Sequence, residues 1–174
     1  MRSLSACFLF SLLLVGSSIG QDSLISKHPF FSPMLDGSWT EKGEMALPQG
    51  AVAGESTSEA KAILGGQWIQ QDGKAAFGST NWEWRWMFRL AKTQDGKEVV
   101  QARCMDTNGQ VADYLGEIMN DGKVLRLSRS LSETVKNVIQ VTNQDDGGRL
   151  VEVAIIDNTG KTSLQYKALG KKNP

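Results

Sequence analysis

Large apolar side chains and polar side chains alternate along residues 81–90 of this 174-residue chain. The apolar ones occupy every second position: Trp82, Trp84, Trp86, Phe88 and Leu90. A period of two is the geometry of a β-strand, so these five side chains project from one face. The charged residues between them are Glu83, Arg85 and Arg89. Burying those charges without partners is costly, which predicts that the tryptophan row faces the interior of the protein.

Further segments of strand length follow, and turn signals separate them. They are residues 98–106, 111–119, 123–131, 135–141, 149–157 and 161–169. Most of the turns contain Asp-Gly, Asn-Gly or Gly-Gly pairs, which tolerate the positive φ that tight hairpins require. Residues 49–173 contain no proline, and a proline would remove a backbone donor from a central strand. Regular spacing of about 8–12 residues between turns indicates an antiparallel meander.

Together with two or three earlier strands, these segments predict an all-β fold of about nine or ten strands. A meander of that length has two exposed edges, and closing the sheet into a barrel removes them. We therefore expect a single antiparallel barrel. The alternative is an open, curved sheet wrapped over the N-terminal segment.

Residues 56–66 allow two interpretations. Ser56 and Glu59 have the spacing of a capping box, which would begin a short helix. Read as a strand, the same residues run into Gly65-Gly66 and form a hairpin with the segment that begins at Trp68. The strand is favoured, because a helix would leave the Trp68 segment without its hairpin partner.

The beginning of the chain has the pattern of an export signal. Arg2 precedes an apolar run over residues 6–15 and a stretch of small residues over 16–20, which together are typical of a secretory signal peptide. We therefore expect an exported protein, in the periplasm or outside the cell. The apolar residues around Pro29 and Pro33 predict a short helical turn that caps one end of the barrel. The expected organisation is a signal peptide over 1–20, a cap over 21–36, the barrel over 37–170 and a tail over 171–174.

Charge and cysteine content exclude several functional classes. Lys and Arg number 19, as do Asp and Glu, so the formal net charge is zero at pH 7. Neither a basic footprint for nucleic acid nor a polybasic cluster for an anionic membrane is present, so we expect no nucleic-acid partner and no stable membrane anchor. Without the signal peptide, Cys104 is the sole cysteine. It cannot form an intramolecular disulfide and is expected to be buried and unreactive.

The sequence offers little for catalysis or metal binding. Its only histidine, His28, precedes the first expected strand, whereas zinc sites and Ser–His or Cys–His catalysis need converging ligands or a placed base. Carboxylates that could in principle meet in a cavity are Glu41, Glu44, Glu83 and Glu117, but their spacing gives no reason to bring them together. We expect no enzymatic activity and no metal site.

Gly37-Ser38-Trp39 resembles the G-x-W motif that opens the first strand of lipocalins and related calycin barrels. The run from His28 through Met45, followed by residues 59–71 with their Leu64–Trp68 hairpin, is similar to an uncharacterised family of bacterial lipocalin-like domains. The resemblance implies a barrel with an internal cavity and no particular reaction. In calycins a basic residue near the end of the last strand packs across the first-strand tryptophan, and Lys167 or Lys171 is the nearest match here.

The resemblance also bears on cofactors. Nitrobindins, another group of ten-stranded barrels, hold haem through a histidine on a late strand. His28 lies before the first strand instead. We therefore expect no haem and no other cofactor.

Alternation in the neighbouring strands extends the expected inner wall beyond Trp82, Trp84 and Trp86. The additional residues are Ala102, Cys104, Ala112, Tyr114, Leu125 and Leu127. Arg129 follows Leu125 and Leu127 at the same spacing of two, so its side chain points to the same face. It lies either at the barrel mouth in solvent or against an anionic ligand group. Three interpretations of the tryptophan row stay open: a filled core, a cavity for a small apolar or amphipathic molecule, and an outward row that binds sugars or a protein partner. In the cavity interpretation, the three tryptophans and Tyr114 bury the apolar part of the ligand.

Overall fold

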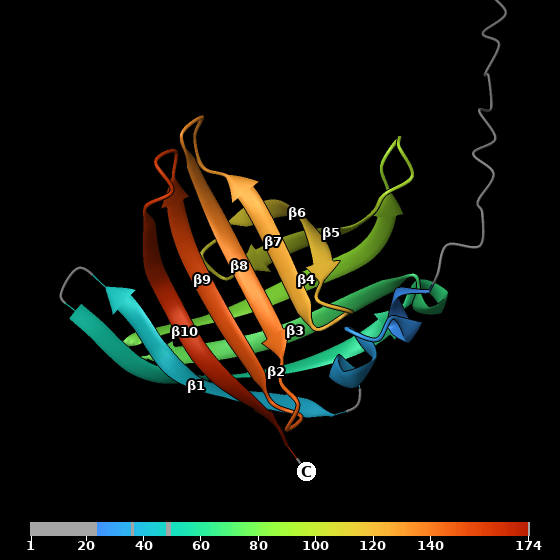
Figure 1. Ribbon diagram of the computed structural model, residues 1–174. Coiled ribbons are helices and arrows are strands. Elements are labelled where there is room, and N and C mark those ends of the chain that lie inside the picture. Colours follow the sequence, from blue (N-terminus) through green and yellow to red (C-terminus); the bar gives the residue numbers. More distant parts are fainter. Residues whose placement is uncertain (1–23, 36, 48–49, 174) are drawn as a thin grey trace, which may run out of the picture.

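The chain folds into a closed barrel of ten antiparallel strands in which each strand pairs with its neighbours in sequence and β1 pairs with β10 (Figure 1). The computed structural model describes residues 24–35, 37–47 and 50–173. The strands are β1 (Ser38–Leu47), β2 (Gly50–Ile63), β3 (Trp68–Phe77), β4 (Thr80–Lys92), β5 (Glu98–Asp106), β6 (Val111–Met119), β7 (Val124–Ser130), β8 (Val135–Asn143), β9 (Arg149–Asp157) and β10 (Thr162–Lys172). The predicted all-β meander barrel is confirmed.

Residues 56–63, for which the sequence allowed a helix or a strand, belong to a strand. Residues 50–63 form β2, and a short 3₁₀ turn, η3 (Leu64–Gly66), connects it to β3. Gly65 and Gly66 have positive φ, which an L side chain rarely adopts, so this connection requires its glycines. At the other end of the chain, Lys171 and Lys172 belong to β10, so the expected tail over 171–174 is wrong. They pair with Thr40 and Trp39 of β1 and help to close the barrel.

Two 3₁₀ turns, η1 (Ile25–Lys27) and η2 (Ser32–Met34), cover one end of the barrel, where the blue segment lies in Figure 1. Ile25, Phe30 and Phe31 lose all of their exposed surface there. The side-chain amide of Asn143, at the end of β8, donates a hydrogen bond to the Phe30 carbonyl oxygen (3.2 Å). The expected cap is thus present as a plug. The expected signal peptide lies outside the described residues.

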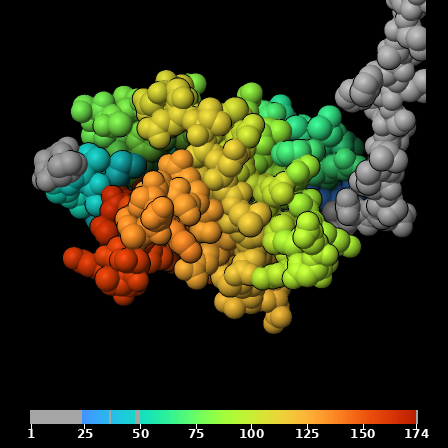
Figure 2. Space-filling view, turned by 90° about the horizontal axis from the view of Figure 1, so that it is seen from above, coloured from blue at the N-terminus to red at the C-terminus, as the bar shows by residue number. Residues whose placement is uncertain are grey.

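The opposite end of the barrel is the mouth, where the connections β3–β4, β5–β6, β7–β8 and β9–β10 lie. Seen from above, the chain from about β5 to β8, coloured lime green to orange, forms one continuous face of the molecule (Figure 2). No helix in the described part of the chain is long and apolar enough to cross a membrane.

Side chains alternate between the interior and the outer surface as the sequence predicts. Ala102, Ala112, Tyr114, Leu125 and Leu127 are all buried in the cluster that packs on the plug. The outward charges pair across neighbouring strands: Arg85 with Asp72, Arg103 with Asp113, and Lys97 with Glu117. Such exposed pairs cost little, which is why the tryptophans and not the charges face inward.

Candidate functional site

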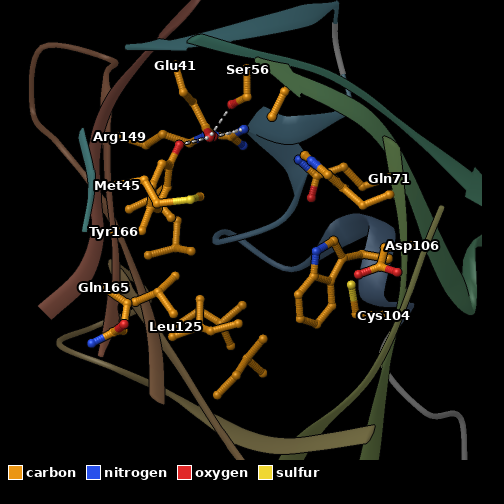
Figure 3. A pocket seen from close by; sticks show the side chains of 18 of the residues that line it. Glu41, Met45, Ser56, Gln71, Cys104, Asp106, Leu125, Arg149, Gln165 and Tyr166 are labelled. Carbon is orange, nitrogen blue, oxygen red and sulfur yellow. Dashed lines mark hydrogen bonds and ion pairs between the residues drawn. The ribbon is translucent and has the colours of Figure 1, made fainter. Parts of the chain in front are cut away.

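The barrel encloses a cavity of about 380 Å³ between the plug and the mouth (Figure 3). Phe30 and Met34 of the plug line one end of it, and the lining also includes Asp106, the last residue of β5, and Gln165, near the start of β10. Clefts of this volume, mostly apolar with a few polar groups, are typical of sites for small molecules. The interior of this barrel is therefore not filled by its own side chains.

Three tryptophans of β4 form one wall of the cavity. Trp82, Trp84 and Trp86 all line it, whereas Glu83 and Arg85 between them are exposed. Trp86 stacks on Phe88 with 5.6 Å between ring centres, and Trp82 stacks on Phe77 with 5.7 Å. The inward row expected from the sequence is present, and the alternative of an outward tryptophan row is wrong.

An aliphatic wall faces the tryptophans. It consists of Leu125, Leu127, Ile139, Val141, Val151 and Val153, contributed by strands β7 to β9. Cys104 of β5 also lines the cavity, directly opposite Trp86 in the ladder. Burial, and to a smaller extent the neighbouring Asp106 carboxylate, raises the pKa of the Cys104 thiol to about 11. The thiol is therefore neutral at physiological pH and acts as a small apolar group.

A buried ion pair supplies most of the polarity of the cavity. Arg149 of β9 and Glu41 of β1 contact each other across β10, with 2.5 Å between Nη2 and Oε1. Their side chains are only 3% and 9% exposed. Both pair with Gly170 of β10, one from each side, and a Cβ atom on this glycine would lie 2.8 Å from Cγ of Arg149. Gly170 thus leaves the space in which the two side chains meet.

Hydrogen bonds connect this pair to its neighbours in the wall. Ser56 donates to Oε2 of Glu41 (3.0 Å), and the Tyr166 hydroxyl donates to the same oxygen (3.4 Å) (Figure 3). Burial raises the pKa of the Tyr166 phenol far above its ordinary value, so the hydroxyl keeps its proton and remains a donor. Arg149 donates from Nη2 to Ser58 (3.1 Å). The charges of the pair compensate each other inside the apolar interior.

The cation that packs on Trp39 is Arg149, and the expectation of Lys167 is wrong. The guanidinium carbon of Arg149 lies 4.5 Å from the centre of the Trp39 ring, and Trp39 is 3% exposed. The side chain of Lys167 points outward from β10 and forms an ion pair with Glu152 on the surface (3.3 Å). Lys171 is also exposed. A planar guanidinium stacks on an indole better than an ammonium does, so the arginine is physically the better partner. Gly37 immediately precedes the strand that carries Trp39 and has positive φ.

Tyr114 and Arg129 do not reach the cavity. Tyr114 packs on Trp86, which does line the cavity, with 5.1 Å between ring centres, and the tyrosine hydroxyl donates to Asn137 (3.1 Å). Arg129 packs on the Tyr114 ring at 5.3 Å and is not among the cavity residues. It lies two positions beyond Leu127 on β7, so among the described residues Arg149 is the arginine that lines the cavity.

The carboxylates considered in the sequence do not converge. Glu41 lines the cavity, whereas Glu44 and Glu83 are exposed and Glu117 pairs with Lys97. His28 lies at the plug, where its Nδ1 accepts the Phe30 backbone N–H (3.1 Å). Among the described residues, no three His, Cys, Asp or Glu side chains gather as a metal site requires.

The interior also contains three residues that were not predicted from the sequence, Arg149, Gln71 and Ser58, together with Glu41, for which no role was predicted. The signal that could have identified them is a spacing of two positions from a buried residue on the same strand. Glu41 lies two positions after Trp39 on β1, and Gln71 lies two positions after the buried Ile69 on β3. A polar residue on a row of inward positions indicates a buried partner or a ligand contact.

Comparisons with known proteins support the fold. Sixteen chains among solved structures match, and one of them is the crystal structure of Rv2717c from M. tuberculosis, with a TM-score of 0.57 and 12% sequence identity. The match covers 82% of this chain and 94% of that chain. No family model matches the sequence, and no curated protein is similar to it. At this identity the likeness concerns the barrel alone.

Proposed function

We propose that this protein is an exported, lipocalin-like binding protein that takes a small apolar or amphipathic molecule into its barrel. The observation that carries the proposal is the cavity of about 380 Å³ between the tryptophan wall and the aliphatic wall. Space of this size inside a small barrel is unfavourable when empty, because the surrounding side chains lose their packing contacts. A bound apolar molecule restores those contacts.

The driving force for binding is burial of apolar surface. Each methylene moved from water into the cavity contributes about 0.8 kcal/mol. Flat indoles add dispersion contacts and lose little conformational entropy, because neighbouring rings already hold Trp82 and Trp86 in place. The proposal assigns no catalytic step to the site.

Cavity-filling substitution tests the proposal. Ala75 lines the cavity and is 7% exposed, whereas its neighbour Ala76 is exposed on the outer face. We expect phenylnaphthylamine, a neutral dye that fluoresces in apolar surroundings, to bind the wild type with saturation. Ala75→Leu should weaken this binding at least about tenfold, since the added methyl groups occupy ligand space.

Ala76→Leu is the matched control, because it adds the same atoms outside the barrel and should leave the affinity unchanged. Circular dichroism is the check that both variants fold. Equal dye affinities in folded Ala75→Leu and Ala76→Leu would place the binding elsewhere and contradict the proposal.

A further inference from the structure

Gln71 presents an unpaired oxygen to the cavity. Only 6% of the residue is exposed, and it lies on β3 opposite Trp86 of β4. Its Nε2 donates to the Ser58 hydroxyl (3.0 Å). Its Oε1 has no hydrogen-bond partner among the described residues and points into the cavity (Figure 3). An unpaired amide oxygen in an apolar site is unfavourable and calls for a donor.

The charged groups of this wall pair with each other, although Nε of Arg149 is buried without a hydrogen-bond partner among the described residues. Glu41 receives donors from Arg149, Ser56 and Tyr166, and Arg149 contacts Glu41 and Ser58. The ion pair therefore has no excess charge to offer a ligand. An anionic group at Gln71 would have no free cation, and an ammonium group would have no free carboxylate. Burying either charge costs far more than burying a hydroxyl group that donates one hydrogen bond.

Of the described residues, one other charged side chain lines the cavity, and it lies toward the mouth. Asp106 faces Trp84 across the β4–β5 ladder, and its Oδ1 accepts the backbone N–H groups of Asn108 (2.9 Å) and Gln110 (3.1 Å). This carboxylate disfavours an anionic group at the entrance as well. Both ends of the cavity therefore select against a carboxylate ligand.

We infer that the cavity takes an uncharged amphiphile, a molecule with a hydroxyl or amide N–H group on an apolar body, and that Gln71 Oε1 accepts the hydrogen bond of that group. This inference rests on the proposed function and specifies its ligand class. The polar group lies beside Trp86, near the plug, and the apolar body extends toward the mouth along Trp84 and Trp82. Phe30 and Met34 close the space beneath the polar group.

The test is a competition series in which only the head group changes. Decanol, decanoate, decylammonium and decyl methyl ether compete with phenylnaphthylamine for the purified wild-type protein at neutral pH. We expect decanol to bind at least about tenfold more tightly than either charged member, since their head groups must be desolvated without a partner. The ether has no donor and should bind about fivefold more weakly than decanol, the factor that corresponds to one neutral hydrogen bond.

Two variants assign the preference to Gln71. In Gln71→Leu, decanol should lose about fivefold in affinity and become equal to the ether. Gln70→Leu is the control, because the Gln70 side chain faces outward and hydrogen-bonds to Asp72 (2.6 Å). It should leave the ligand order unchanged.

The outcomes separate the two claims. If neither the dye nor any member of the series binds the folded protein, the proposed function fails. If the dye binds but decanoate or decylammonium binds more tightly than decanol, or the ether equals decanol in the wild type, the inference about the head group is wrong. The wild-type series decides this even if Gln71→Leu does not fold.

Discussion

Gly73 on β3 lies directly opposite Trp84 on β4, and the indole of Trp84 packs across the glycine. A Cβ atom on Gly73 would lie 2.2 Å from Cζ2 of Trp84, well inside van der Waals contact. The absence of a side chain at residue 73 therefore allows the central tryptophan to lie against the barrel wall. The width of the cavity at its middle depends on this pair.

Gly73→Ala should displace the Trp84 indole. We expect a loss of about 1–3 kcal/mol in the free energy of unfolding, as for other overpacked sites, together with weaker dye binding. Urea unfolding and dye titration measure the two effects. Lys74→Ala, on the exposed outer face, is the control. Unchanged stability and affinity in Gly73→Ala would mean that the indole does not rest on the glycine.

Trp84→Ala should weaken ligand binding more than folding. The side chain borders the cavity, so its removal enlarges an existing space and should cost less than the about 3–5 kcal/mol of a full core truncation. Dye affinity should fall at least about tenfold, because the lost indole is a main contact surface. Trp68→Ala serves as the control, since Trp68 lies on the outer face beneath Arg89. A purely structural role for Trp84 would instead reduce stability and leave the affinity of the remaining folded protein unchanged.

The buried ion pair should show strong coupling in unfolding experiments. Arg149→Met leaves Glu41 buried without its cation and should cost about 3–5 kcal/mol. The double variant Glu41→Gln/Arg149→Met should lose less than the sum of the two single variants, since neither charge is then left alone. Additive losses would contradict a direct interaction between the two side chains.

Cys104 provides a pH-dependent reporter inside the cavity. Its pKa is raised from 9.0 to about 11, so the thiolate fraction at about pH 8 should be roughly a hundredfold lower in the folded protein than in the unfolded chain. Iodoacetamide should therefore modify Cys104 slowly, with a rate that rises toward pH 11, as mass spectrometry of its peptide can show. The raised pKa stabilises the fold fully below pH 9.0, and this contribution is lost as the pH rises through about 11. Rapid alkylation of the folded protein at about pH 8 would place the thiol in solvent.

The sequence predicted the barrel and one wall of the cavity because both follow from periodicity. Alternation fixed which side of β4 faces inward, and the glycine-containing turns fixed where most hairpins occur. The same parity placed Cys104, Leu125 and Leu127 in the cavity wall.

The polar network could not be predicted in the same way, because it depends on register across strands that are distant in sequence. Arg149 and Glu41 are separated by more than one hundred residues and meet only because both flank Gly170 of β10. Arg129 lies on the inward-facing row of its strand, yet the sequence could not reveal that it packs on Tyr114 outside the cavity. Alternation along a strand tells whether a side chain points inward or outward. Its position along the barrel axis and its partners follow from how the barrel closes.

The most direct test of the cavity as a binding site is a titration followed by the indole N–H signals in a ¹H–¹⁵N correlation spectrum. Phenylnaphthylamine should shift the signals of Trp82, Trp84 and Trp86 with one common saturation curve, because all three line the cavity. The signal of Trp68, on the outer face, should stay in place. A titration that shifts Trp68 alone, or leaves the three cavity tryptophans unchanged at saturating dye, would contradict the account.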